Sequence, residues 1–362
     1  MGFNCGLVGL PNVGKSTIFN ALTAAGAKVE SFPFSTIKTN IGVVPVPDER
    51  LERLAALYPE KKKVPTTLEF LDIAGLVRGA HEGEGLGNQF LAEIRNVDAI
   101  AHIVRCFEDP LVPHVDGSLD PKRDVEVVEL ELALKDLETL ENTLDKLQPK
   151  ARAGEREVSK QLQLLERVRE AVRQGTPVRM LELDEEERAR LRGLGLLTEK
   201  PVLFVANVGD EDENTYSQAV AALARERGAG YVAIRGRLEM EIVEASQDEA
   251  ERATWRREWK IEESGLERLI RAGYQLLELI TFFTTDGPEV RAWTVKRGTK
   301  APQAGAKIHT DFEKRFIQAE VVPIEQLLGK GSLHAVKEAG LLQRVGEHYQ
   351  VQDGDVIHFV VA

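Results

Sequence analysis

Cysteine is almost absent from this sequence of 362 residues, which contains only Cys5 and Cys106. Both lie inside apolar, strand-like stretches, and neither has the neighbours or the spacing of a metal-binding motif. We therefore expect two buried thiols and no redox or metal centre built on cysteine.

Long apolar runs are also missing, and none approaches the roughly 20 residues that a membrane helix needs. The first nine residues lack the basic segment and apolar core of a signal peptide. The composition, 43% hydrophobic and 29% charged, is that of an ordinary soluble protein. These features predict a cytoplasmic protein with no membrane partner and, at roughly 150 residues per domain, two or three domains.

Basic residues are fewer than acidic ones, 47 against 59, which gives a formal net charge of −12. An excess of negative charge opposes broad nonspecific binding to nucleic acid, so we expect no DNA partner. A local basic face on one domain remains compatible with this charge.

Strand-like and helix-like segments alternate over the first hundred residues and again from about residue 201. This rhythm predicts an α/β fold, with a parallel sheet covered by helices. The expected strands are residues 3–8, 41–46, 67–71, 99–106, 201–206 and 230–234, and the expected helices are residues 15–25, 216–227 and 266–279.

Two helical stripes interrupt the alternation, and Pro149 and Gly154 lie between them. Apolar residues spaced alternately by three and four predict helices with one apolar face, and two such helices predict an antiparallel hairpin. The hairpin is either a structural arm or a surface that binds a partner. The first stripe is Leu130, Ala133, Leu137, Leu140, Leu144 and Leu147, and the second is Val158, Leu162, Leu165, Val168 and Val172.

The segment after the first strand matches the pattern G-x-x-x-x-G-K-[ST] in full. Its glycines let main-chain N–H groups surround phosphates, and the N-terminus of the following helix adds a partial positive charge. Lys15 brings a positive charge to the β- and γ-phosphates, and Ser16 offers a hydroxyl to Mg²⁺. We predict that a Mg²⁺–nucleoside triphosphate is bound by Gly9, Pro11, Asn12, Val13, Gly14, Lys15, Ser16 and Thr17.

A second phosphate motif, D-x-x-G, follows the strand at 67–71 and consists of Asp72 to Gly75. An Asp at a strand end can hold Mg²⁺, and the Gly75 N–H can reach a γ-phosphate. Thr36 is the candidate for the second Mg²⁺-binding hydroxyl, with Ser35 as the alternative.

The segment from Asn207 to Asp210 follows an apolar strand, where GTPases carry N-K-x-D. In that motif the Asp accepts the guanine N1 and N2 hydrogens, and the Lys stem packs along the base. Val208 stands here in place of Lys, which weakens the case for guanine. The predicted base-binding residues are Asn207, Val208 and Asp210.

Five stretches together resemble the YchF group of Obg-related P-loop proteins, also called Obg-like ATPases. They are residues 9–17, 31–40 (SFPFSTIKTN), 72–90 (DIAGLVRGAHEGEGLGNQF), 104–108 (VRCFE) and 290–314 (VRAWTVKRGTKAPQAGAKIHTDFEK).

The resemblance implies a GTPase-type G domain with a coiled-coil insertion and a C-terminal α+β domain of β-grasp (TGS) fold. The expected division is 1–120 and 199–279 for the G domain, 121–198 for the helical insertion and 280–362 for the TGS domain. It also implies a preference for ATP over GTP and association with ribosomes or ribosomal RNA. The family commonly has N-x-x-E at the base site, whereas this chain has Asp210, as guanine-specific proteins do. A GTP-specific translational GTPase is therefore the alternative.

Leu76 follows the D-x-x-G glycine, where many Ras-like proteins place a Gln that orients the attacking water. A Leu side chain cannot hydrogen-bond to water, so another group has this role or turnover is slow. His81 and His114 are the candidate catalytic residues beside Lys15, and neither histidine is the third possibility. Asn12 is a candidate ligand for K⁺.

The segment from Arg291 to Arg315 mixes basic residues with aromatic ones, a combination that suits RNA contact. The alternative is a solvated strand face above core aromatics. Two functions stay open: a nucleotide-controlled switch whose hydrolysis is coupled to ribosomes, and a nucleotide-sensing binding module with incidental hydrolysis.

Overall fold

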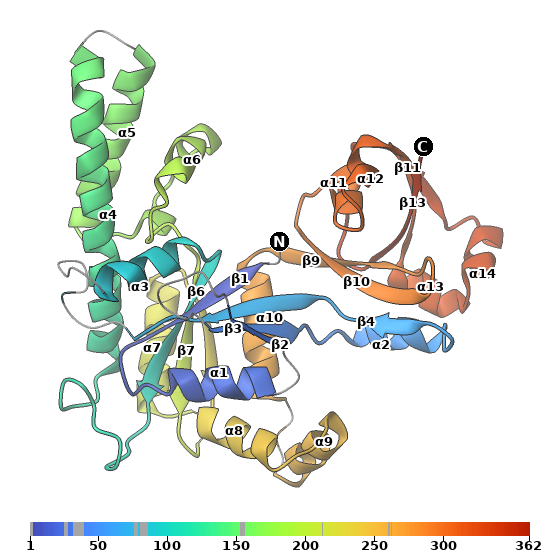
Figure 1. The fold of residues 1–362 in the computed structure, drawn as a ribbon, viewed down its shortest axis with the longest axis horizontal. Coiled ribbons are helices and arrows are strands. Elements are labelled where there is room, and N and C mark those ends of the chain that lie inside the picture. Colours follow the sequence, from blue (N-terminus) through green and yellow to red (C-terminus); the bar gives the residue numbers. More distant parts are fainter. Residues whose placement is uncertain are drawn as a thin grey trace. The chain divides into compact units, whose positions relative to one another are not determined.

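The computed structural model describes residues 3–24, 28–31, 40–75, 79, 86–152, 156–211, 213–259, 261 and 263–362 (Figure 1). These residues form two compact units. The first unit consists of Phe3–Val43 and Glu69–Gly273, and the second of Val44–Leu68 and Tyr274–Ala362.

A seven-stranded sheet in the order β2-β3-β5-β1-β6-β7-β8 is the centre of the first unit. Strands β5, β1, β6, β7 and β8, adjacent in that order, are mutually parallel, and β2 is antiparallel to β3. Every residue of β6 and β7 is buried, as expected for strands covered on both faces. The strands are β1 (Asn4–Val8), β2 (Lys28–Ser31), β3 (Asn40–Pro45), β5 (Thr67–Asp72), β6 (Ala99–Cys106), β7 (Val202–Val208) and β8 (Gly230–Ile234).

Helices follow the strands in the α/β pattern that the sequence predicts. α1 packs on β1 and on α8, while α4 and α7 pack on each other and on β6 (Figure 1). The alternation did not reveal α8 or α9, which lie between β8 and α10. The helices are α1 (Lys15–Ala24), α3 (Leu86–Arg95), α7 (Thr215–Glu226), α8 (Gly236–Glu244), α9 (Glu249–Glu258) and α10 (Gly265–Leu276).

The predicted helical hairpin consists of α4 (Pro121–Arg152) and α5 (Arg156–Arg173), which pack along each other (Figure 1). The apolar core of this arm contains members of both stripes, among them Leu140, Leu144, Leu165 and Val168. Short helical segments complete it: η1 (Val178–Met180), α6 (Glu185–Leu191) and η2 (Arg192–Leu194).

Two details of the hairpin differ from the sequence-based expectation. Pro149 does not interrupt the first helix but lies inside α4, three residues before its end at Arg152. The missing N–H of Pro149 removes one hydrogen bond, and the helix nevertheless continues for three more residues. Leu130 is 56% exposed and stands outside the arm core, although its spacing fits the stripe.

The second unit contains a six-stranded sheet in the order β12-β11-β13-β9-β10-β4. Its strands are β4 (Lys62–Val64), β9 (Leu279–Thr284), β10 (Glu289–Lys296), β11 (Phe316–Pro323), β12 (Gln343–Val345) and β13 (Asp355–Val361). Its helices are α2 (Glu49–Ala56), α11 (Ala301–Ala306), α12 (Asp311–Lys314), α13 (Ile324–Lys330) and α14 (Leu333–Glu338).

Residues 44–68 belong to the second unit, whereas the sequence-based division placed them in the first part of the G domain. Strand β4 pairs in parallel with β10 at the edge of the sheet. Leu51 and Leu54 of α2 lie in one core cluster with Phe283 and Val290, which explains the assignment. Arg50 reinforces it through an ion pair with Asp353 at 2.8 Å.

Both cysteines are buried, as expected. Burial raises the pKa of Cys5 to about 12 and that of Cys106 to about 12, so both are protonated thiols at neutral pH. Among the described helices, none is both long enough and apolar enough to cross a membrane.

Candidate nucleotide-binding site

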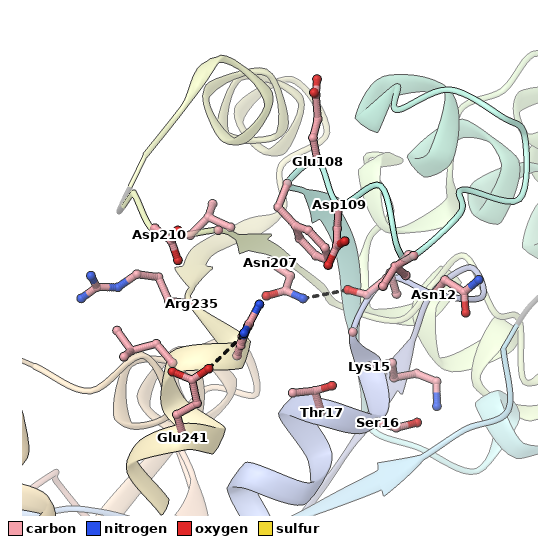
Figure 2. Close-up of a pocket in the computed structure, with 18 of the residues that line it drawn as sticks. Asn12, Lys15, Ser16, Thr17, Glu108, Asp109, Asn207, Asp210, Arg235 and Glu241 are labelled. Carbon is pink, nitrogen blue, oxygen red and sulfur yellow. Dashed lines mark hydrogen bonds and ion pairs between the residues drawn. The ribbon is translucent and has the colours of Figure 1, made fainter.

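A cavity of about 1080 Å³ lies in the first unit, where the carboxyl ends of several parallel strands meet (Figure 2). Nearly all residues predicted to bind a nucleotide line it: Pro11, Asn12, Val13, Gly14, Lys15, Ser16, Thr17, Gly75, Asn207, Val208 and Asp210. Gly9 is not among the lining residues. It lies against β6, where an added Cβ would be 2.7 Å from the Ile103 carbonyl oxygen.

The loop between β1 and α1 has the backbone that phosphate binding needs. Asn12 and Gly14 have positive φ angles of 62° and 88°. Gly14 is required for space as well, because a Cβ there would lie 2.1 Å from the Asn207 Nδ2 atom. The loop leads into α1 at Lys15, so the amino end of this helix lies at the cavity and favours an anion.

Lys15 forms an ion pair with Asp72 at the carboxyl end of β5. Both side chains are mostly buried, with 10% and 16% exposure. Gly75 lies beside the loop, since an added Cβ would be 3.7 Å from Pro11. The Ser16 hydroxyl and the Asp72 carboxylate together offer the hard oxygen ligands that Mg²⁺ prefers.

Asn207, at the end of β7, connects two elements of the site instead of pointing only toward a base. Its Nδ2 donates to the Val13 carbonyl at 2.8 Å (Figure 2), and its Oδ1 accepts from the Gly236 N–H at 3.1 Å. The residue is 4% exposed. It therefore joins the phosphate loop to the first residue of α8.

Arg105 and Phe107 were not singled out by the sequence analysis, although both lie in its VRCFE stretch. Arg105 is buried at the end of β6, and its guanidinium lies 4.5 Å from the centre of the Phe107 ring. It donates to the Phe107 carbonyl at 3.0 Å and to the Val112 carbonyl at 2.8 Å. Phe107 and Val112 line the cavity, so Arg105 holds this wall in place. A charged residue inside an otherwise apolar strand is the signal that could have revealed it.

The cavity wall beyond Asp210 is formed largely by residues of α8 and by the end of α9. Arg235, Arg237, Leu238, Glu241 and Trp259 line this part, and Figure 2 shows Asp210 and Arg235 on the same side of it. The Arg237 Nε donates to Glu241 at 2.9 Å. These residues were not among those predicted, because the strand and helix pattern of the sequence did not predict α8 and α9.

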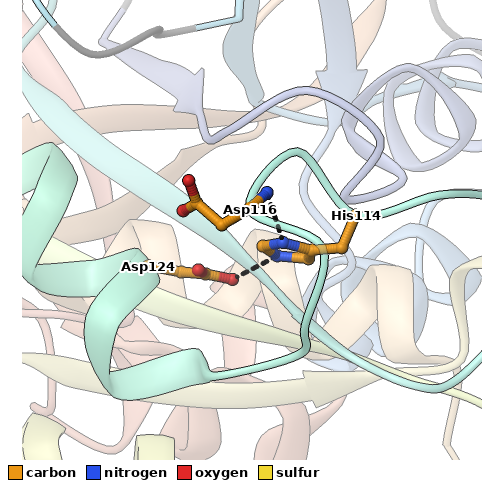
Figure 3. Close-up of side chains that lie close together, drawn as sticks. All are labelled: His114, Asp116 and Asp124. Atoms are coloured by element: carbon orange, nitrogen blue, oxygen red, sulfur yellow. Dashed lines mark hydrogen bonds and ion pairs between the residues drawn. The ribbon is translucent and has the colours of Figure 1, made fainter.

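His114 does not line the cavity. Its Nδ1 accepts from the Asp116 N–H at 3.1 Å, and its Nε2 lies 2.8 Å from Asp124 Oδ2 (Figure 3). Since Nδ1 is an acceptor, the proton is on Nε2 and is donated to Asp124. Both ring nitrogens are thus engaged in this arrangement, so His114 would have to leave Asp124 before it could orient a water molecule, and its catalytic role stays a prediction.

His114, Asp116 and Asp124 lie close enough together to be considered as metal ligands. The Arg123 side chain contacts both carboxylates, Asp116 at 3.4 Å and Asp124 at 3.3 Å. A guanidinium already in place offsets one of the two negative charges and contacts an oxygen of each carboxylate, which opposes a second cation. The cluster is therefore a structural ion-pair network.

Four positions named from the sequence lie outside the described residues: the candidate Mg²⁺ ligand Thr36, its alternative Ser35, the candidate catalytic histidine His81, and Leu76.

The phosphate loop, the Asp72–Gly75 motif and the parallel sheet define a P-loop nucleotide-binding G domain of the GTPase type. Residues 4–145 match the family model described as 50S ribosome-binding GTPase, and residues 279–362 match the YchF-GTPase C-terminal model, described as a protein of unknown function (DUF933).

Curated relatives match along the whole chain. The chain is 47% identical to the "Ribosome-binding ATPase YchF" of Escherichia coli O157:H7 and 46% identical to that of Bacillus subtilis, over 99% of both chains in each case. The solved structure of the Schizosaccharomyces pombe YchF GTPase superimposes with a TM-score of 0.86 at 34% identity, covering 99% of this chain and 98% of that one. The chain belongs to the YchF family.

The contacts of Asn207 generate a prediction about nucleotide binding. Asn207→Ala removes both hydrogen bonds that hold the phosphate loop against α8, so we expect the Kd for Mg²⁺–ATP to rise about tenfold or more. Titration calorimetry measures this change. Asn20→Ala, at an exposed position on α1, is the matched control and should leave the Kd unchanged. Equal affinities of the Asn207 variant and the wild type would contradict the assigned role.

Proposed function

We propose that the protein is a Mg²⁺-dependent ATPase whose nucleotide state controls its binding to ribosomes. The observation that carries this proposal is the cavity, which brings the P-loop, Gly75 and the Asn207–Asp210 segment together in a member of the YchF family. The two curated bacterial relatives named above are described as ribosome-binding ATPases. A ribosome-associated role also favours a cytoplasmic location.

The phosphate end of the cavity supports triphosphate chemistry. Ser16 and Asp72 would hold Mg²⁺, with Thr36 as the proposed second hydroxyl ligand, and the ion would neutralise charge on the phosphate oxygens. Lys15 now neutralises Asp72, and a bound triphosphate competes for the same ammonium group. Binding of the nucleotide therefore frees the Asp72 carboxylate for the metal. Lys15 and the Gly75 N–H then stabilise negative charge on the γ-phosphate.

The base end bears on the choice between ATP and GTP. Val208 lacks the long stem that packs along guanine in N-K-x-D proteins, and Phe107 offers an aromatic surface that any purine can use. Asp210 lines the same cavity and is an acceptor that suits guanine. The curated relatives are named ATPases, whereas the Schizosaccharomyces pombe protein is named a GTPase. We propose ATP as the preferred nucleotide, with GTP as the alternative.

Calorimetric titration of nucleotide-free protein with Mg²⁺–ATP and, separately, Mg²⁺–GTP tests the base preference. We expect ATP to bind at least tenfold more tightly than GTP, because Val208 occupies the position of the Lys that packs along guanine in N-K-x-D proteins. Asp210→Asn should weaken the binding of GTP more than the binding of ATP, since only guanine donates hydrogen bonds to this carboxylate. Tighter binding of GTP by the wild type would make the protein a GTPase with the same phosphate chemistry.

The second unit offers a basic surface for contact with ribosomal RNA. Arg297, Lys300, Lys314 and Arg315 are exposed in the segment that follows β10. The aromatic residues of this region are engaged within the unit: Trp293 stacks under Arg291 at 4.3 Å, and Phe312 and Phe316 pack against a core cluster. The proposed contact is therefore mainly with phosphates, and base stacking contributes little.

Coupling between hydrolysis and ribosomes separates the two functions that the sequence left open. A switch predicts that purified ribosomes raise the multiple-turnover rate of ATP hydrolysis several-fold. Arg297→Glu with Lys300→Glu should weaken this stimulation, and Lys330→Glu, an exposed control in the same unit, should not. An unchanged rate in the presence of ribosomes would favour a nucleotide-sensing binding module with incidental hydrolysis.

Asn12 is proposed as a ligand for K⁺, which would supply positive charge near the transferred phosphate. Its amide Nδ2 donates to the Pro113 carbonyl at 3.1 Å, so the side chain is held at the mouth of the phosphate loop with an oxygen to offer. We expect a several-fold higher hydrolysis rate in K⁺ than in Na⁺, and Asn12→Ala should abolish the difference. Equal rates of the wild type in the two salts would exclude this role.

A further inference from the structure

Helix α4 carries three carboxylate residues in the interior of the first unit: Asp124, Glu131 and Asp136 are 1%, 3% and 0% exposed. A buried carboxylate is costly unless hydrogen bonds satisfy it. Each of the three binds a different segment of the chain, so together they mark where this long helix is attached to the rest of the domain.

Two of the attachments lie at opposite ends of the parallel strands, one toward their carboxyl ends and one toward their amino ends. Asp124 accepts from His114, in the loop whose beginning lines the nucleotide cavity (Figure 3). Asp136 accepts from the Leu197 N–H at 2.7 Å and the Thr198 N–H at 2.8 Å. This second segment precedes β7 and so lies at the amino ends of the parallel strands, away from the cavity. Asp136 therefore serves the stability of the fold.

The third attachment reaches the phosphate motif. Glu131 Oε1 accepts from the Gly79 N–H at 2.7 Å. Gly79 follows Gly75 by four residues, and Gly75 lines the cavity beside Pro11. Asp72 begins the same stretch and pairs with Lys15. Of the described residues, Asp72 is therefore held by Lys15 of the phosphate loop, and Gly79 is held by α4.

We propose that Glu131 is a positioning residue for ATP hydrolysis and the link between the helical arm and the phosphate motif. A hydrogen bond from a main-chain N–H to a carboxylate is charge-assisted and holds its donor firmly. By fixing Gly79, Glu131 sets how the Gly75 segment meets the γ-phosphate. Because α4 continues into the arm through Leu140 and Leu144, a partner that displaces the arm displaces Glu131 as well. This inference rests on the proposed ATPase activity.

Steady-state kinetics of the full-length protein tests the positioning role. We expect Glu131→Ala to lower kcat for Mg²⁺–ATP about tenfold, because small misplacements at a reacting centre are expensive. KM and the calorimetric Kd should stay within about twofold, since the phosphate loop and the base end are untouched. Glu131→Gln keeps a carbonyl acceptor and should recover most of kcat. Asp136→Asn, on the same helix and equally buried, should lower Tm and retain kcat.

Tryptic cleavage of the arm provides a readout that does not require turnover. The exposed residues Lys146, Lys150 and Arg156 lie near the tip of the hairpin. In the wild type we expect cleavage there to differ at least twofold between a non-hydrolysable ATP analogue and ADP, and Glu131→Ala should remove the difference.

Three outcomes would overturn the inference. The first is a Glu131→Ala variant with wild-type kcat. The second is a decrease in kcat that is proportional to the decrease in Tm in Glu131→Ala, Glu131→Gln and Asp136→Asn alike. The third is tryptic cleavage of the wild-type arm at the same rate with the ATP analogue and with ADP. A wild type that binds ATP without hydrolysing it would instead overturn the proposed function, and the cleavage experiment would still decide whether Glu131 links the arm to the site.

Discussion

The carboxyl edge of one parallel sheet is the constraint on which the site depends. Strands β1, β5, β6, β7 and β8 all run in the same direction, so the segments that follow them emerge at one edge. The phosphate loop, Gly75, the Phe107 wall, Asn207 and Arg235 come from five separate places in the sequence, yet they meet around one cavity. A shift of any central strand by one residue would move its side chains to the other face and dismantle this arrangement.

The local motifs were predictable from the sequence because each consists of a few consecutive residues whose types and spacing indicate their chemistry. The loop around Lys15, the Asp72–Gly75 motif and the Asn207–Asp210 segment are all where the sequence places them. What Asn207 does was less accessible, because its partners Val13 and Gly236 are distant in sequence. The role of Arg105 was not predictable for a similar reason, because it donates hydrogen bonds to main-chain carbonyls of a loop, which no side-chain motif indicates.

Other features could not be read from local patterns because they depend on which surfaces meet. Leu130 fits the helical stripe, yet it is exposed because no element covers that part of α4 in the described structure. His114 lies in a polar loop that invites a catalytic role, but Asp124 and the Asp116 N–H engage both of its nitrogens. In both cases the surroundings of the side chain in the folded chain, which residue type and spacing do not reveal, add what the local pattern lacks, and the catalytic role of His114 stays a prediction.

The assignment of residues 44–68 to the second unit has a consequence for how the chain acquires its fold. During synthesis α2 and β4 emerge more than two hundred residues before β10, the strand with which β4 pairs. Leu51 and Leu54 therefore have no apolar partners from the C-terminal segment while the rest of the first unit is synthesised. Contacts of such long sequence separation form slowly, since loop closure must precede any stabilisation. Completion of the second unit is thus a late event, and the nascent chain carries an amphipathic helix whose apolar face has no partner until the last segment is made.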